Sequence, residues 1–275
     1  MSTVRLLKAA ARGLAGAALA CALGAAQSAD LPPLTSDIQQ KYDAYIARTE
    51  ARIERETHSA AFLWSAQSPE WLQRLRRGEV VTQPGSGTGD SDIGHGLILD
   101  WIGAIYVPST TLARVVALLQ DYDNHKRYFQ PEVVDSHLIG RDGDTCRIRY
   151  RIVKHYILTE VVDTDQTATY QSDGDKRMTS RSYATRIVEV KDAGKPGERE
   201  MDPRKDRPMV WRLNTYWRLE EKDGGVYIEC QSITLTRAAP PGLGWLVTLI
   251  VRSLPREALA HVLESTRDGA LGRKR

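Results

Sequence analysis

The segment "MVWRLNTYWRLEEKDGGVYIECQSITLTR", residues 209–237, has the pattern of two β-strands joined at Asp223-Gly224. An Asp-Gly pair between two runs rich in β-branched and aromatic residues is a strong signal for a hairpin with a two-residue type I′ turn. Such a turn fixes the register, so we expect Leu219 opposite Ile228. This hairpin is the centre from which the rest of the fold is predicted.

Alternation along the two strands divides their side chains between two faces of a sheet. The predicted inner face holds Trp211, Leu213, Thr215, Trp217, Leu219, Ile228, Cys230, Ser232 and Thr234. The predicted outer face holds Arg212, Asn214, Tyr216, Arg218, Glu229 and Gln231, with Arg218 and Glu229 paired in contact with solvent. Indoles mixed with hydroxyls on the inner face are typical of a ligand cavity, although hydrogen bonds from these hydroxyls to neighbouring backbone explain the pattern equally well.

Further strands and helices are predicted on both sides of this hairpin. Strand patterns cover 96–108, 133–140, 144–156, about 157–163, 167–172 and 177–190, with turns at 142–143, 164–166 and 173–175. Helical spacing covers 109–123, capped by Ser109 or Thr110, and a C-terminal helix begins near Ser253. Because so long a sheet needs a cover, the fold class is α+β, with a curved antiparallel sheet wrapped around the C-terminal helix.

The first 29 residues are predicted to be a signal peptide. Arg5, Lys8 and Arg12 precede an apolar run over 14–26 that is too short for a comfortable membrane span. We therefore expect export, with a periplasmic or secreted mature protein. Lipidation at Cys21 is disfavoured because the preceding Leu stands one place late. Without the leader, 35 Lys and Arg face 35 Asp and Glu, which gives no support for nucleic-acid binding.

The expected domain organisation has four parts. A signal peptide (1–29) precedes a helical arm with a mobile Gly/Ser loop (30–93), whose helix over 35–57 has a thin apolar stripe. A ligand-binding domain follows over 94–271, and a basic tail covers 272–275. The apolar segment 242–255 is too short to cross a bilayer, so it is either a buried turn or a lid that touches a membrane.

Catalytic and metal-binding motifs are missing from the sequence, so neither a metal nor a cofactor is predicted. The candidates for acid–base chemistry are Asp135, His137 and Tyr150. A turn at Asp142-Gly143 puts Asp135 and His137 on the inner face, whereas a bulged turn rotates both outward.

The segment "DYDNHKRYFQPEVVDS", residues 121–136, first suggests a reactive cluster. Its position predicts instead the end of a helix, a polar turn and the start of a strand. Asp121, Asp123 and His125 are expected to bond to backbone groups and solvent there. Elsewhere, Cys146 and Cys230 are expected to be free, buried thiols, and a row of Arg147, Arg149 and Arg151 is expected to be solvated.

Three segments resemble the START-like helix-grip superfamily, which includes birch-pollen-allergen, polyketide-cyclase and coenzyme-Q-binding proteins. They are "LLQDYDNHKRYFQPEV", "VDSHLIGRDGDTCRIRYRI" and "VYIECQSITLTR…LPREALAHVLESTR", and the resemblance covers about 96–271. The hairpin is also similar to that of exported bacterial members with no assigned chemistry. The resemblance implies a cavity for lipids, sterols, quinones or polyketides, and no catalytic motif of the cyclases can be placed on this chain.

The resulting hypothesis is a non-enzymatic carrier or sensor that holds a lipid, isoprenoid or quinone in an internal cavity. The cavity is predicted to be lined by Trp101, Tyr150, Trp211, Leu213, Thr215, Trp217, Ser232 and Thr234. One alternative is a cyclase- or dehydratase-like enzyme that uses Asp135, His137 and Tyr150. Another is an envelope interaction module that uses the helix over 35–57 and the arginine row. The ligand and the oligomeric state stay open at this point.

Overall fold

The computed structural model of the chain describes residues 33–59, 61–155, 159–202, 208–238 and 244–273, with residues 155 and 244–253 described by their backbone. The expected signal peptide, with Cys21, lies outside these residues. The helical elements are α2 (Ser36–Thr57), η1 (Trp64–Gln67), α3 (Pro69–Arg76), α4 (Leu112–Gln120), η2 (Tyr122–Asn124), α5 (His125–Tyr128) and α6 (Gly244–Ala270). The strands are β1 (Val81–Pro84), β2 (Asp90–Asp92), β3 (Gly96–Pro108), β4 (Val133–Asp142), β5 (Thr145–His155), β6 (Thr159–Asp173), β7 (Arg177–Lys191), β8 (Arg199–Glu200), β9 (Val210–Lys222) and β10 (Gly225–Arg237).

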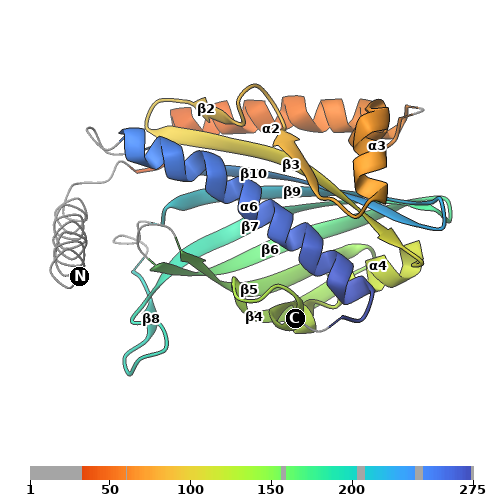
Figure 1. Ribbon diagram of the computed structural model, residues 1–275. Coiled ribbons are helices and arrows are strands. Elements are labelled where there is room, and N and C mark those ends of the chain that lie inside the picture. The colour runs from red at the N-terminus through yellow and green to blue at the C-terminus, as the bar shows by residue number, and fades with distance from the viewer. Residues whose placement is uncertain (1–32, 60, 156–158, 203–207, 239–243, 274–275) are drawn as a thin grey trace, which may run out of the picture.

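The strands pair in the order β1-β3-β10-β9-β7-β6-β5-β4, and every pairing is antiparallel. The short strands β2 and β8 join β3 and β7. Helix α6 crosses one face of this curved sheet, which we call the inner face (Figure 1). The face that packs against α2 is the outer face. The predicted α+β architecture, with the sheet wrapped around the C-terminal helix, is confirmed.

The predicted register of the β9–β10 hairpin is confirmed. Leu219 pairs with Ile228, and Arg218 pairs with Glu229. Asp223 and Gly224 have φ angles of 58° and 77°, as a type I′ turn requires at both central positions. Local turn chemistry therefore determines how these two strands are aligned.

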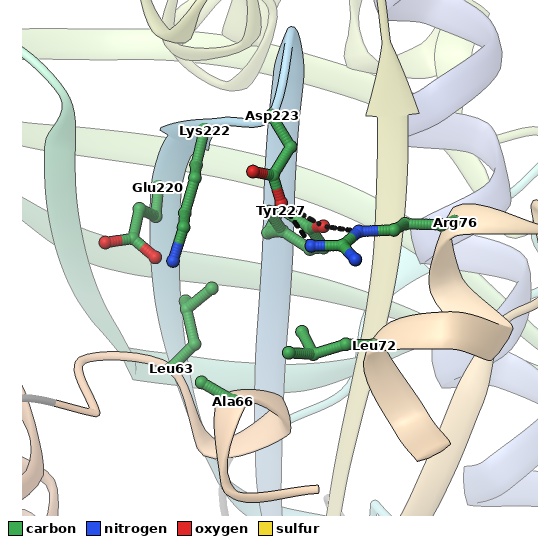
Figure 2. Close-up of a pocket in the computed structure, with 8 residues that line it drawn as sticks. All are labelled: Leu63, Ala66, Leu72, Arg76, Glu220, Lys222, Asp223 and Tyr227. Atoms are coloured by element: carbon green, nitrogen blue, oxygen red, sulfur yellow. Dashed lines mark hydrogen bonds and ion pairs between the residues drawn. The ribbon is translucent and has the colours of Figure 1, made fainter. Parts of the chain in front are cut away.

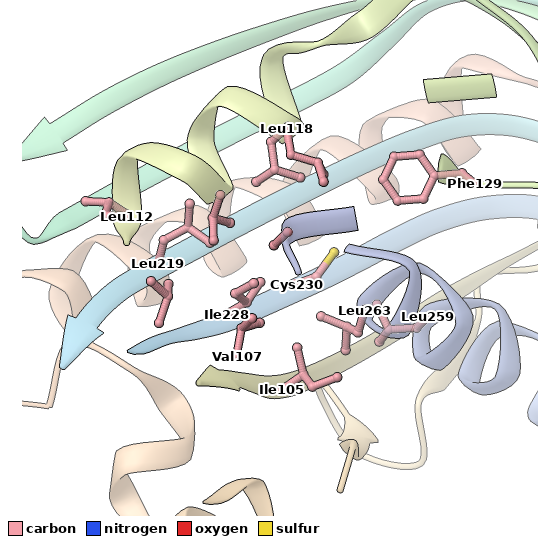
Figure 3. Packing of buried hydrophobic residues seen from close by; sticks show 14 residues of the cluster. Ile105, Val107, Leu112, Leu118, Phe129, Leu219, Ile228, Cys230, Leu259 and Leu263 are labelled. Carbon is pink, nitrogen blue, oxygen red and sulfur yellow. The ribbon is translucent and has the colours of Figure 1, made fainter. Parts of the chain in front are cut away.

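The inner face carries the main apolar core, in which α6 and α4 pack on the central strands. Figure 3 shows Leu259 and Leu263 of α6 close to Ile105 and Cys230 of the sheet. Gly103 leaves room for this helix, because a Cβ there would lie 2.8 Å from Leu263 Cδ1. Cys146 and Cys230 are both free and buried, as predicted. Helix α6 begins at Gly244, so the prediction of a start near Ser253 was wrong, and Pro255 lies inside the helix.

The outer face of the central strands is covered by the N-terminal arm. Helix α2 places Ile38 and Tyr42 against Ile98 and Ile233, while η1 and α3 cover the other end of β3 and β10. The helix begins with Thr35 as its cap, close to the predicted start. The expected loop after it contains β1 and β2, which extend the sheet beside β3. The arm is thus an integral layer of the fold.

Trp211 lies on the outer face, so its prediction for the inner face was wrong. The register shifts next to it, because Arg212 pairs with Leu235 while Val210 pairs with Thr236. The extra residue of this β-bulge turns the indole towards α2, where it packs in the outer cluster. Arg237 lies over the indole, with its Cζ 4.7 Å from the ring centroid.

Two predicted turns were also wrong. The expected turn at 164–166 lies within the continuous strand β6, at the point where Thr185 of β7 is the extra residue of a β-bulge. The turn between β4 and β5 is one residue later than expected, since Asp142 pairs with Thr145. In the helix that precedes β4, the cap of α4 is Thr111 rather than Ser109 or Thr110.

Candidate functional site

A row of hydroxyl groups crosses the inner face at the centre of the sheet. Ser182 of β7 pairs with Thr215 of β9, Thr215 with Ser232 of β10, and Ser232 with Trp101 of β3. Residues paired directly across antiparallel strands have Cβ atoms about 4.5–5.5 Å apart, so these side chains are adjacent. We call Ser182, Thr215 and Ser232 the hydroxyl row. The sequence predicted two of its three members.

The hydroxyl row differs from an ordinary apolar core in two respects. Its side chains are half-buried, as are the neighbouring indoles of Trp101 and Trp217. Within the described part of the chain, the three hydroxyls form no side-chain hydrogen bond. Desolvating a hydroxyl without a hydrogen-bond partner costs free energy, so an apolar residue would be more stable at these positions in a dry core. This arrangement leaves donors and acceptors available beside two large apolar surfaces.

Leu213 and Thr234 pair with each other one step further along the hairpin, and both are half-buried on the inner face. Of the apolar segment 242–255, residues 242–243 lie outside the described residues, and 244–253 form the start of α6 and are described by their backbone. Ser182 was missed by the sequence reasoning. The alternation in "TSRSYATR" could have placed it on the inner face, but its pairing with Thr215 requires knowing that β7 adjoins β9.

His125 and Tyr150 form a second polar feature of the inner face. His125 is 5% exposed, and its Nε2 donates to the Leu118 carbonyl oxygen at 3.2 Å. Its Nδ1 therefore accepts from the Tyr150 hydroxyl at 2.8 Å. Burial lowers the pKa of His125 to about 4 and raises the pKa of Tyr150 well above its ordinary value. Both groups are neutral near pH 7.

The expectation that His125 contacts solvent was therefore wrong. Aromatic rings of Tyr122, Phe129 and Tyr150 surround it, with centroid separations between 4.9 and 5.8 Å. The neighbouring Tyr170 hydroxyl donates to the Leu119 carbonyl oxygen at 3.1 Å. The two interactions satisfy carbonyls at the C-terminal end of α4, which helices leave without an internal partner. The aromatic residues around position 125 were the available sequence signal for its burial.

Asp135 and His137 lie on the outer face, which is the second of the two positions that the sequence left open, and not beside Tyr150. They pair with Arg151 and Arg149, because the strand β4 is bulged between Leu138 and Gly140. The His137 Nε2 is 2.9 Å from Asp135 Oδ2, and Lys126 binds the same carboxylate at 2.8 Å. Both side chains are exposed to solvent. Of the three acid–base candidates, Tyr150 alone lies on the inner face, where it donates to His125.

The outer face of the central strands contains a chain of buried charged and polar groups. Arg218 Nε is 3.2 Å from Glu229 Oε2, and Arg218 Nη1 is 2.7 Å from Glu56 Oε2 on α2. The Glu229 carboxylate also accepts from the backbone N–H groups of Trp64 and Ser65 at 2.9 and 2.7 Å. Burial raises the pKa of Glu229 although Arg218 lies beside it. The prediction that Arg218 and Glu229 contact solvent was wrong, since they are 3% and 1% exposed.

The same chain continues along α2. Arg52 binds Glu56 and Gln231, each at 2.8 Å, and Gln231 donates to Asp100 at 2.7 Å. Tyr45 of α2 donates to the other oxygen of Asp100 at 2.7 Å. We call this chain, from Glu229 through Arg218, Glu56, Arg52 and Gln231 to Asp100, the outer network. The outer network fastens the N-terminal arm to the sheet, because donors and acceptors of the two layers form hydrogen bonds and ion pairs with each other.

Two of the three arginines in the row that was expected to be solvated form ion pairs with carboxylates. Arg149 and Arg151 form ion pairs with Asp165 and Asp163 on β6, at 2.7 and 2.8 Å. Arg147 is exposed. The apolar stripe of α2 is used against the sheet. The helix α2 and the arginine row are therefore already engaged with other parts of the protein, at least in part. Neither is the open contact surface that was predicted for an interaction module.

Two hollows lie on the outer side of the sheet. One is a cleft of about 20 Å³ between α3 and the β9–β10 turn, where Arg76 binds Tyr227 and Asp223 (Figure 2). It has room for about one water molecule. The other is a groove of about 550 Å³ between the C-terminal half of α2 and strands β6, β7 and β9. Volumes of about 300–1,000 Å³ are typical of small-molecule sites.

Neither a membrane-spanning helix nor a cluster of metal-ligand side chains is found among the described residues. No helix there combines the length and the apolar character needed to span a membrane. In the same part of the chain, no three His, Cys, Asp or Glu side chains converge as metal ligands would.

Comparison with known proteins gives likenesses of fold. No family model matches the chain, and no curated protein matches it. A fragment of a STAR-related lipid transfer protein from Xanthomonas axonopodis is 20% identical, with 65% of this chain and 99% of that chain covered and a TM-score of 0.43. The Zhui aromatase/cyclase from Streptomyces sp. R1128 is 11% identical, with 63% and 94% covered and a TM-score of 0.43.

Human STARD10 is 11% identical, with 73% of this chain and 80% of that chain covered and a TM-score of 0.42. At such identities the likeness concerns the fold alone. The antiparallel strand order and the long C-terminal helix enclosed by the sheet give the described part of this chain a helix-grip architecture.

Proposed function

We propose that the chain binds an apolar ligand with a polar head, such as a lipid, an isoprenoid or a quinone, against the inner face of the sheet. The hydroxyl row supports this proposal, because Ser182, Thr215 and Ser232 lie beside the indoles of Trp101 and Trp217 and have no side-chain hydrogen-bond partner among the residues that the structure describes. A ligand carbonyl or hydroxyl would satisfy these groups, and its apolar part would cover the indoles.

The residues beside the hydroxyl row favour ligand binding over catalysis. Tyr150 and His125 are neutral near pH 7 and hydrogen-bonded to each other. Within the described ranges, no base is in hydrogen-bond contact with Thr215 or Ser232 to activate it as a nucleophile. The proposal includes export through the segment 1–29, which the mass of the mature N-terminus would test.

The experiment compares ligand binding by matched variants of the full mature chain. Native mass spectrometry and organic extraction identify any co-purified molecule, and titration with a fluorescent fatty acid and with a short-chain ubiquinone measures affinity. We expect Thr215→Val with Ser232→Ala to weaken binding about tenfold, as the loss of one or two hydrogen bonds to the head group implies.

Thr167→Val is the matched control. Thr167 is also a half-buried strand threonine without a side-chain partner among the described residues, but it lies on the outer face of β6. Its substitution should leave both affinities unchanged. A protein that yields no extractable lipid and binds neither probe, or a double variant that binds both probes as tightly as the parent, would contradict the proposal.

A further inference from the structure

The groove on the outer side of the sheet is a separate candidate site, with walls of different composition. Its floor is the outer face of β6 and β7, and its other wall is the C-terminal half of α2. Thr169, Arg181 and Tyr216 form one row of the floor, since Arg181 pairs with both of the others. Gln171 and Thr179 form the next row. The floor thus presents polar side chains from three adjacent strands.

One end of the groove is closed by firmly held side chains. Arg177 donates to Glu220 at 2.8 Å, and its Cζ lies 4.9 Å from the centroid of the Phe62 ring. In the row formed by Thr169, Arg181 and Tyr216, the Tyr216 hydroxyl donates to Glu50 of α2 at 3.0 Å. These contacts fix the spacing between helix and sheet, so the groove is part of the folded architecture.

Between these fixed points, donors and acceptors face each other without pairing. Arg181 and Gln171 on the floor are exposed, and their side chains form no hydrogen bond within the described part of the chain. Glu50 and Glu54 on the helix wall offer carboxylate oxygens, and neither forms an ion pair with Arg181. A ligand that spans the groove must therefore accept from the floor and donate to the helix.

A hydroxyl group does both, because it carries one donor and two acceptor lone pairs. The charges that line the groove also argue for a ligand without net charge. Glu50, Glu54 and Asp173 face Arg177 and Arg181, so an anion or a cation would meet like charge on one side. Ile53, Phe62, Tyr216 and Trp217 are the apolar and aromatic lining residues, and the other thirteen are polar or charged. This lining suits a ligand that carries many hydroxyl groups better than a lipid tail.

We propose that this groove binds a neutral polyhydroxyl ligand, namely a short oligosaccharide. Arg181 and Gln171 donate to sugar oxygens, and Glu50 and Glu54 accept from sugar hydroxyls. Two residues along β7 from Arg181, Tyr183 is 47% exposed on the same face and extends the site with an aromatic surface. The site is distinct from the inner face and does not depend on the function proposed there.

The test uses maltotriose and N,N′,N″-triacetylchitotriose as probes with the full mature chain, measured by saturation-transfer NMR and calorimetry. We expect at least one of them to bind with an affinity in the millimolar range or tighter, at probe concentrations up to about 10 mM. Arg181→Ala should weaken that binding about tenfold, and Gln171→Ala should weaken it by a smaller factor.

Arg147→Ala is the matched control, since Arg147 is another exposed arginine without a side-chain partner among the described residues on the outer face, but it does not line the groove. It should bind as the parent does, and so should the inner-face variant with Thr215→Val and Ser232→Ala. The proposal is overturned if neither saccharide binds, if Arg181→Ala binds as tightly as Arg147→Ala, or if a tripeptide such as Gly-Ser-Gly displaces the bound saccharide.

Discussion

On the outer face of the β9–β10 hairpin, Arg218 and Glu229 are almost completely buried and every charged group has a partner. On the inner face, three residues along the same strand, Thr215 is half-buried and its hydroxyl has no partner among the described residues. Polar groups on the outer face thus hold two layers of the protein together. Those of the hydroxyl row contribute nothing visible to the fold, which is why we assign them to a ligand.

The difference also concerns what each substitution would cost. Removing one member of a matched buried network leaves its partners desolvated and unpaired, which is strongly destabilising. Removing a hydroxyl that has no partner leaves nothing unsatisfied. Stability measurements on the two faces therefore separate structural polar groups from groups reserved for binding.

The largest effect is expected for Glu229→Ala in the outer network. The substitution leaves Arg218 beside an empty space and removes the acceptor of two backbone N–H groups, those of Trp64 and Ser65. We expect the free energy of unfolding, measured by urea titration, to fall by about 3–5 kcal/mol.

The double substitution Arg218→Met with Glu229→Leu tests the reason for that loss. It removes both charges and keeps the apolar volume, so it should be less destabilising than Glu229→Ala alone. A loss below about 1 kcal/mol for Glu229→Ala would mean that the arm does not depend on the outer network.

The second effect is a pH dependence of stability due to His125. This side chain lies on the inner face, and both of its ring nitrogens have hydrogen-bond partners. Burial holds the pKa of His125 at about 4, below the ordinary value of 6.5. A group whose pKa is lowered by folding stabilises the protein above its unfolded-state value, and this contribution is lost as the pH falls from 6.5 towards 4. The loss is about 3 kcal/mol over that range, since each pKa unit corresponds to about 1.4 kcal/mol.

Urea unfolding of the parent and of His125→Gln at several pH values from 7 to 4 measures this contribution as a difference. The comparison removes the effects of Asp100 and Glu229, whose raised pKa values act in the opposite direction. Equal slopes for the parent and His125→Gln would show that His125 does not titrate as a buried group.

The third effect concerns the tightly packed part of the inner face. A methyl group at position 103 would lie 2.8 Å from Leu263 Cδ1 and 3.2 Å from Leu259 Cδ2. Gly103→Ala should therefore push α6 away from β3 and lower the free energy of unfolding by about 1–3 kcal/mol. In Gly140→Ala the nearest atom is the mobile end of Arg147, at 3.0 Å, so thermal unfolding should shift little in that control. A similar shift in both variants would mean that α6 has room to move.

The sequence predicted features that depend on neighbouring residues and missed those that depend on distant ones. The Asp223-Gly224 turn determines its own register, so nearly all inner-face positions of β9 and β10 were correct. The bulge at Trp211 and the one that turns His137 outward depend on partner strands, and neither leaves a mark in the local alternation. The burial of Arg218 depends on α2, a helix whose polar sequence gives little sign of what it covers.

The smallest effect on stability, and the sharpest test of the comparison, is expected for Thr215→Val with Ser232→Ala. Neither hydroxyl has a side-chain partner in the part of the chain that the structure describes, and valine is a better strand former than most polar residues. The free energy of unfolding should therefore change by no more than about 0.5 kcal/mol. Affinity for an apolar ligand should nevertheless fall about tenfold, as proposed above. A loss of more than about 2 kcal/mol in urea unfolding would show that the hydroxyl row is structural. The two faces of the hairpin would then use their polar groups in the same way, and the reason to place a ligand on the inner face would be gone.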